Sequence, residues 1–133
     1  MSHAPAYLLA ALWALPALAQ DDAKEERVVL PSGLEAELQE MLWDRPGGGL
    51  VYRFRFVAPA FEDAQDLDSV SADLEYLCNA YALPRVANTG PEPHRIIVSL
   101  ADKPSEFGQF DPSVTQVFEA YSVGNGACIW EMF

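Results

Sequence analysis

Residues 50–59, LVYRFRFVAP, constrain the fold more than any other part of the chain, because they alternate strictly between two kinds of side chain. Three aromatic residues would share one side of a strand, while Arg53 and Arg55 would share the other. This pattern predicts a β-strand with one buried aromatic face and one partly wet arginine face. The buried face requires a second layer to cover it.

Residues 66–83, DLDSVSADLEYLCNAYAL, predict that second layer. Their apolar side chains recur at the three- and four-residue spacing of a single helical stripe. Asp66 and Asp68 supply capping oxygens and negative charge at the start, and we expect Pro84 to end the helix. The stripe consists of Leu67, Val70, Leu74, Leu77, Cys78 and Tyr81.

The C-terminal residues 114–133 predict a β-hairpin. They contain an Asn-Gly dipeptide, which favours the tight two-residue turn of type I′. With that dipeptide as the loop, Val123 lies opposite Cys128 and Tyr121 lies opposite Trp130. Cys128 and Trp130 then face the same side of the last strand.

Residues 34–42, LEAELQEML, allow two interpretations. Their leucine and methionine side chains have helical spacing, which favours a helix. Leu34, Ala36 and Leu38 also alternate as they would in a strand, so a strand remains the alternative.

The elements together predict an α+β fold. Residues 28–33 favour a short strand that ends in a turn, and residues 95–100, RIIVSL, favour a short buried strand. We therefore expect a single, mostly antiparallel sheet of four to five strands. One long amphipathic helix packs on one face of this sheet, and a β-hairpin closes the C-terminus.

The N-terminal residues 1–19 have the layout of a secretory signal peptide. Tyr7–Leu15 is an unbroken apolar run too short to span a bilayer, and small residues precede Gln20. A buried N-terminal helix is the alternative, but charge begins abruptly after this segment. We expect a flexible charged lead-in over 20–27, one domain over 28–133 and no transmembrane segment in the mature chain, which would be periplasmic or secreted.

Export determines how the two cysteines are interpreted. In an oxidising compartment, two cysteines in a small domain most simply form one disulfide. A bond between Cys78 and Cys128 would join the apolar stripe of the helix to the last strand. The sequence therefore predicts a tail that is fixed against the main helix.

The chain is strongly acidic, with 20 Asp and Glu against 8 Lys and Arg and a net charge of −12. Nucleic-acid phosphates and anionic membrane surfaces both attract Lys and Arg, so this balance argues against either as a partner. It is compatible with a cationic partner, or with solubility alone.

Catalytic and metal-binding patterns are sparse. His94 is the only histidine after the predicted signal peptide, and no G-x-S-x-G segment precedes it. One histidine and two cysteines cannot provide a four-ligand zinc site. The acids within 62–68 lack calcium-loop spacing and are explained by helix capping. We therefore expect no metal and no cofactor.

Phe107 and Phe110 lie within residues 102–113, DKPSEFGQFDPS, an irregular segment rich in Gly and Pro. Aromatic rings have no periodic reason to occur there. We expect them to pack under the sheet, with an exposed contact patch as the alternative. Together with Arg53 and Arg55, they are the candidate interaction residues.

These observations favour a non-catalytic exported protein that binds or accompanies a protein partner in the periplasm. The first alternative is a small-ligand binding module with an aromatic-lined cleft. The second is a carboxylate-dependent hydrolase, although no pair of acids is marked for that role, and we expect Glu131 to form an ion pair with Arg53 or Arg55. The aromatic side chains available to a cleft are Tyr52, Phe54, Phe56, Tyr121 and Trp130.

Several segments resemble an uncharacterised family of short exported proteins from alphaproteobacteria, over nearly all of the mature chain. Some members carry an acetolactate synthase label. That activity does not suit this chain, because those catalytic subunits are several times longer and carry a Gly-Asp-Gly motif that is absent here. The similar segments are LPSG (30–33), RFRFVAP (53–59), LEYLCNAYALP (74–84), IIVSLAD (96–102), EFG (106–108) and GACIWEMF (126–133).

Overall fold

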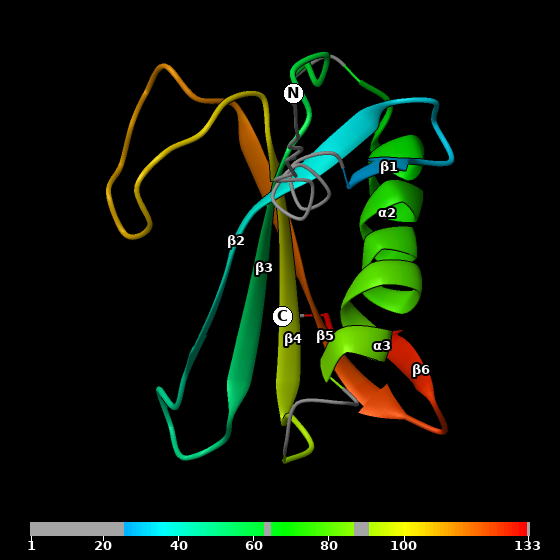
Figure 1. Cartoon of the computed structure of the whole chain (residues 1–133), viewed down its shortest axis with the longest axis vertical. Coiled ribbons are helices and arrows are strands. Elements are labelled where there is room, and N and C mark those ends of the chain that lie inside the picture. Colours follow the sequence, from blue (N-terminus) through cyan, green and yellow to red (C-terminus); the bar gives the residue numbers. More distant parts are fainter. Residues whose placement is uncertain (1–25, 63–64, 87–90, 133) are drawn as a thin grey trace, which may run out of the picture.

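The computed structural model of the chain describes residues 26–62, 65–86 and 91–132. The predicted signal peptide, 1–19, and most of the predicted lead-in lie outside these residues. Within them, six strands form one curled sheet in the order β1-β2-β3-β4-β5-β6, with the helix packed along one side (Figure 1). No helix among the described residues is long and apolar enough to cross a membrane.

Most neighbouring strands are antiparallel, but β3 and β4 are parallel. Parallel neighbours need a crossover connection, which the helix supplies between them. The strands are β1 (Arg27–Val29), β2 (Glu35–Asp44), β3 (Val51–Val57), β4 (Arg95–Ala101), β5 (Gln116–Gly124) and β6 (Ala127–Trp130).

The predicted α+β fold, with a mostly antiparallel sheet of four to five strands, is therefore wrong. The sheet has six strands in the described residues, it is mixed, and the fold is mostly β. One cause is the crossover helix, which forces β3 and β4 to run in the same direction. The other is β2, a long strand where the sequence favoured a helix.

A β-bulge explains why residues 34–42 resemble a helix. The pairing of β2 with β3 shifts between Leu38 and Glu40, so Gln39 is an extra residue in the ladder. Leu38 lies opposite Phe56 and Met41 lies opposite Phe54, which places both on the same side of the sheet. The bulge thus converts the two-residue spacing of a strand into a three-residue spacing that mimics a helical stripe.

The long helical segment consists of α2 (Leu67–Tyr76), η1 (Leu77–Ala82) and α3 (Leu83–Val86). Asp66 caps its start, accepting the Ser69 N–H as expected. Buried residues on the segment include Leu74, Leu77, Cys78 and Tyr81.

Two details of the predicted helix are wrong. Leu67 is 68% exposed, so the buried stripe does not begin at the first helical residue. Pro84 does not end the segment, because the backbone widens into a π-helix just before it. A proline ring crowds the carbonyl four residues earlier, and the wider turn, in which Leu83 donates to the Cys78 carbonyl, makes room for it.

The core lies between this helical segment and the sheet. Register places Tyr52 beside Ile96 and Ile96 beside Tyr121, so an apolar row crosses three strands beneath the helix. The aromatic side of β3 is thus buried, as its alternation predicted. The buried residues on this face of β3, β4 and β5 are Tyr52, Phe54, Phe56, Ile96, Val98, Leu100 and Tyr121.

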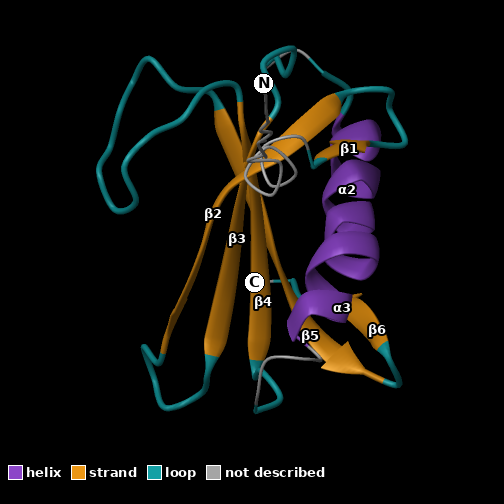
Figure 2. Ribbon diagram, viewed as in Figure 1, coloured by secondary structure: helices purple, strands orange, loops and turns teal. Residues whose placement is uncertain are grey.

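The C-terminal hairpin has the predicted register, with Val123 opposite Cys128 and Tyr121 opposite Trp130. Asn125 and the glycine after it both have positive φ angles, of 53° and 75°, as a type I′ turn requires. The hairpin curls toward the end of the helix (Figure 2). The two faces of the sheet are thus differently covered: the helix covers one, and the loop between β4 and β5 stands off the other.

Candidate binding site

The arginine side of β3 faces away from the helix. The connection between β4 and β5, residues 102–115, projects over this side of the sheet (Figure 2). We call residues 102–115 the β4–β5 loop. Its contacts with β2 and β3 form the candidate site.

Arg55 attaches the loop to the sheet. Its side chain is only 7% exposed, forms an ion pair with Glu40 on β2, and donates to both the carbonyl (3.1 Å) and the hydroxyl (3.2 Å) of Ser105. Gln39, the bulge residue, donates to the same carbonyl at 2.8 Å. The bulge and the arginine therefore hold one point of the loop by polar contacts.

Phe107 stacks against both arginines. Its ring centroid lies 5.3 Å from Cζ of Arg53 and 5.4 Å from Cζ of Arg55, within the range of a cation–π contact. Arg53 also has a carboxylate partner, since its Nε lies 3.4 Å from Oδ1 of Asp44. The ring remains 48% exposed, so the cations hold it in place without burying it.

The loop and the sheet enclose a groove of about 220 Å³. Phe118 on β5, 63% exposed, contributes a second aromatic wall, and Ile97 on β4 contributes an apolar side chain. We call this space the open-face groove. It is lined by Arg53, Arg55, Ile97, Ser99, Ser105, Glu106, Phe107, Gly108, Gln109, Gln116 and Phe118.

Three of the four candidate interaction residues, Arg53, Arg55 and Phe107, meet in this groove. Phe110 is outside its lining and is 91% exposed. The expectation that both rings pack under the sheet is therefore wrong: Phe110 is almost fully exposed, and the half-exposed Phe107 ring lies against the arginines of β3. The loop is held to the sheet by polar contacts at Ser105, and neither ring belongs to the buried core.

The predicted ion pair of Glu131 with Arg53 or Arg55 is also wrong. Glu131 lies 2.9 Å from Arg95 instead, because its segment follows β6 at the far side of β5. Phe118 is a groove residue that was not among the predicted interaction residues. Alternation could have indicated it, because a strand that directs Tyr121 toward the helix directs Phe118 to the opposite face.

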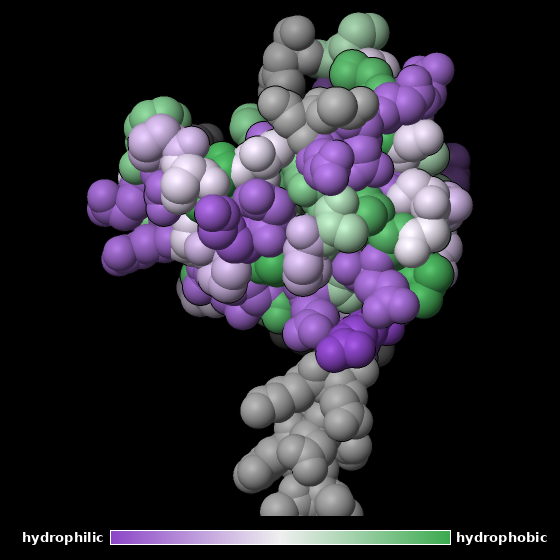
Figure 3. Space-filling view, turned by 90° about the horizontal axis from the view of Figure 1, so that it is seen from above, coloured by the Kyte–Doolittle hydropathy of each residue, from purple (hydrophilic) through white to green (hydrophobic). Residues whose placement is uncertain are grey.

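The electrostatics of the groove are balanced. Both arginines already have carboxylate partners, so the groove offers an anion little free positive charge. On the face seen from above in Figure 3, many hydrophilic residues are exposed, with hydrophobic residues showing between them. The rings of Phe107, Phe110 and Phe118 are all exposed, on a chain whose net charge is −12.

The aromatic residues of β3 do not line one common cleft. Phe54 and Phe56 are buried in the core, whereas Tyr52, although only 6% exposed, lines a separate cavity of about 300 Å³ with Trp43 and Met41. Phe54 and Phe56 make edge-to-face contacts with Tyr81, at centroid distances of 6.3 and 5.1 Å. Trp130 differs, being 53% exposed. The described residues include no group of three or more His, Cys, Asp or Glu side chains arranged to hold a metal.

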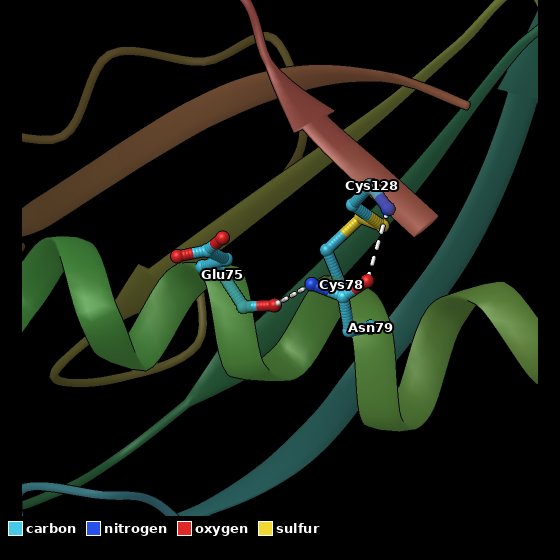
Figure 4. Close-up of a disulfide and its surroundings, with 4 residues drawn as sticks. All are labelled: Glu75, Cys78, Asn79 and Cys128. Atoms are coloured by element: carbon cyan, nitrogen blue, oxygen red, sulfur yellow. Dashed lines mark hydrogen bonds between the residues drawn. A yellow bond between two sulfur atoms is a disulfide. The ribbon is translucent and has the colours of Figure 1, made fainter. Parts of the chain in front are cut away.

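The two cysteines form the predicted disulfide, with their Cα atoms 6.2 Å apart. Asn79 reinforces it, since its side chain accepts the Cys128 N–H at 2.9 Å and donates to the Glu75 carbonyl at 3.1 Å (Figure 4). The contact occupies an N–H of the edge strand β6 that a further strand could otherwise pair with. We call Cys78, Asn79 and Cys128 the latch.

Residues 9–133 match the model of a Family of unknown function (DUF6497). The chain belongs to this family. No curated protein and no solved structure matches the chain. The membership covers nearly the whole chain and assigns it no activity.

Proposed function

We propose that the protein is an exported, non-catalytic binding protein that holds a segment of a partner protein in the open-face groove. The observation that carries this proposal is the pair of exposed rings, Phe107 and Phe118, that wall a groove whose floor is an ordered sheet. Exposed aromatic rings on a fixed support are the usual anchors of protein interfaces.

The chemistry of the groove supports binding rather than catalysis. Its lining contains neither histidine nor cysteine. The Ser105 hydroxyl accepts a hydrogen bond from Arg55, and both arginines are engaged with carboxylates. A nucleophile would need a base within hydrogen-bond reach, and among the described residues no hydrogen bond joins the Ser105 hydroxyl to Glu106, the one acid of the groove lining.

The groove size indicates what it holds. A volume of about 220 Å³ is below the 300–1,000 Å³ that is usual for pockets that enclose a whole small ligand. It suits one or two apolar side chains of an extended segment. The surrounding acidity, with a net charge of −12, favours basic residues next to those side chains.

Export is part of the proposal, and two features support it. Residues 1–19 have the sequence pattern of a signal peptide. The disulfide between Cys78 and Cys128 suits an oxidising compartment such as the periplasm. Mass spectrometry of the protein recovered from the periplasm tests both features, since it reports cleavage before Gln20 and the loss of two hydrogens.

The partner can be identified by placing a photo-cross-linking amino acid at Phe110 in the living cell. Leu67 is the matched control, because it is also exposed, at 68%, but lies on the helix side. A protein cross-linked from position 110 and not from position 67 is then purified. Its affinity for the wild-type protein is measured directly by calorimetry.

Alanine variants then test the groove. We expect Phe118→Ala to weaken binding of the purified partner at least about tenfold, and Leu67→Ala to leave it unchanged. Both side chains are exposed, so neither variant should unfold the protein. Equal affinities for the two variants would contradict the proposal. Charge reversal of Arg55 is avoided, because it would release the loop itself.

A further inference from the structure

A second, smaller cavity lies on the helix side of the sheet, away from the open-face groove. It encloses about 150 Å³ where helix α2 faces strands β5 and β6. Two carboxylates and two aromatic rings meet there. The cavity is lined by Ser71, Glu75, Glu119, Tyr121 and Trp130.

Tyr121 contributes a buried polar group with no bonding partner. The residue is 1% exposed, yet among the described residues its hydroxyl has no hydrogen-bond partner. Buried hydroxyls are nearly always hydrogen-bonded, since leaving one unpaired is costly. Burial, followed by the negative charges of Glu119 and Glu75, raises the pKa of Tyr121. The hydroxyl therefore stays neutral in a site that carries negative charge.

The carboxylates are also available for a ligand. Trp130 donates its indole N–H to Oε1 of Glu119 at 2.7 Å, which holds one oxygen in place. Among the described residues, neither Glu119 nor Glu75 forms an ion pair with a basic side chain. Two acidic groups without a cation, lying next to an unpaired hydroxyl, are arranged to receive a hydrogen-bond donor that carries positive charge.

The latch fixes the geometry of this cavity. Glu75 lies one helical turn before Cys78, and Trp130 lies two residues after Cys128 on the same face of β6. The disulfide and the two hydrogen bonds of the Asn79 side chain therefore tie the helix to β6 next to the cavity; Figure 4 shows these contacts with Glu75, Cys78 and Cys128.

We propose that this cavity binds an alkylammonium group. The two carboxylates supply charge, the rings of Tyr121 and Trp130 attract a cation, and the free hydroxyl accepts one of the ammonium hydrogens. A volume of about 150 Å³ admits such a group and not a drug-sized ligand. The group belongs either to a lysine side chain of a protein or to a small free amine.

Titration of the full oxidised protein with n-butylamine tests the proposal. The indole N–H signal of Trp130 in a nitrogen-15 NMR spectrum reports occupancy, because this group lies in the cavity wall. We expect a saturable shift with butylamine and none with 1-butanol, which has the same chain but no charge. An equal response to the alcohol, or none to the amine, would overturn the proposal.

Charge-removing variants locate the effect. We expect Glu75→Gln and Glu119→Gln each to weaken butylamine binding about tenfold. Glu35→Gln is the matched control, because it removes the same charge from an exposed position on β2 and should change nothing. Equal weakening by all three variants would indicate general attraction to an acidic surface and would reject the site.

Two further arms complete the test. Titration with calcium chloride is the first. A larger shift of the Trp130 signal with calcium than with butylamine would reject the ammonium site in favour of a metal site. Acetyl-Gly-Lys-Gly-amide identifies the source of the ammonium group: binding comparable to that of butylamine supports a protein lysine, and weaker binding supports a free amine. The test does not depend on the open-face groove, because it uses no protein partner.

Discussion

The two faces of the sheet are stabilised by different interactions. The helix face is stabilised by packing of buried apolar side chains, such as Phe54 and Leu77, and by the latch. The open face is held by arginines that contact carboxylates, Ser105 and a phenyl ring, while its aromatic side chains remain exposed. This difference indicates that the helix face contributes most of the stability, and that the exposed aromatic side chains of the open face can be substituted without loss of the fold.

The largest expected contrast is between two phenylalanines. Phe54→Ala removes a ring that is 1% exposed under the helix and should lower the free energy of unfolding by about 3–5 kcal/mol. Phe110→Ala removes a ring that is 91% exposed and should change it by less than about 0.5 kcal/mol. Urea denaturation of both variants measures the difference. Similar losses of unfolding free energy in the two variants would mean that the open face also stabilises the fold.

Removal of the disulfide should have the next largest effect. The bond closes a loop with a sequence separation of 50 residues, and in the chain-entropy model this is worth about 4 kcal/mol. The double variant Cys78→Ala/Cys128→Ala should therefore unfold at much lower urea concentration. Reduction of the wild-type protein is the control and should reproduce the loss. An unchanged midpoint after complete reduction would show that the disulfide does not stabilise the fold.

Asp73 joins the helix to the turn after β1, on the same face. It is 1% exposed and accepts both the N–H (3.0 Å) and the hydroxyl (2.6 Å) of Ser32. Asp73→Ala should cost about 2–3 kcal/mol in urea denaturation, because hydrogen bonds to a buried carboxylate are lost. Asp68→Ala, an exposed acid in the first turn of the same helix, should cost less than about 1 kcal/mol. Equal costs would contradict a bridging role for Asp73.

The features that the sequence could predict are those determined by a few neighbouring residues. The Asn-Gly turn set the hairpin register, and the strict alternation of residues 50–59 indicated both sides of β3. The expectation of an oxidising compartment, together with the count of two cysteines, predicted the disulfide between Cys78 and Cys128, which the structure contains. Each of these depends on a few adjacent residues, or on a count of two cysteines.

The features that sequence could not provide depend on distant contacts. The bulge at Gln39 is fixed by pairing with β3 and by the Ser105 carbonyl, 66 residues away. The groove brings together Phe107 and Phe118 from two segments, and the small cavity brings together Glu75 and Glu119 from the helix and β5. The residue pattern within one segment does not indicate which distant segment that segment will contact.

Alkaline titration should affect the helix face through its buried phenols. The pKa values of Tyr81 and Tyr121 are raised chiefly by burial, so the unfolded chain ionises first, near pH 10. The stabilisation that comes from keeping these phenols neutral is therefore fully present below about pH 10 and is lost as the pH rises toward the folded-state pKa values. The free energy of unfolding should fall by at most about 1 kcal/mol per pH unit for each group after solvent screening. Tyr121→Phe should make this decline shallower. An unchanged slope would show that Tyr121 does not contribute.

The smallest expected effect concerns how the open face is held. Phe107→Leu keeps an apolar side chain but removes the ring that contacts Arg53 and Arg55, and should cost about 0.5–1 kcal/mol in urea denaturation. Phe110→Leu makes the same chemical change on a ring that none of the cation–π contacts involves, and should cost almost nothing. Equal effects would mean that Ser105 alone holds the loop. In that case the Phe107 wall of the groove would be free to move, and a partner would have to order it upon binding, at a cost in affinity.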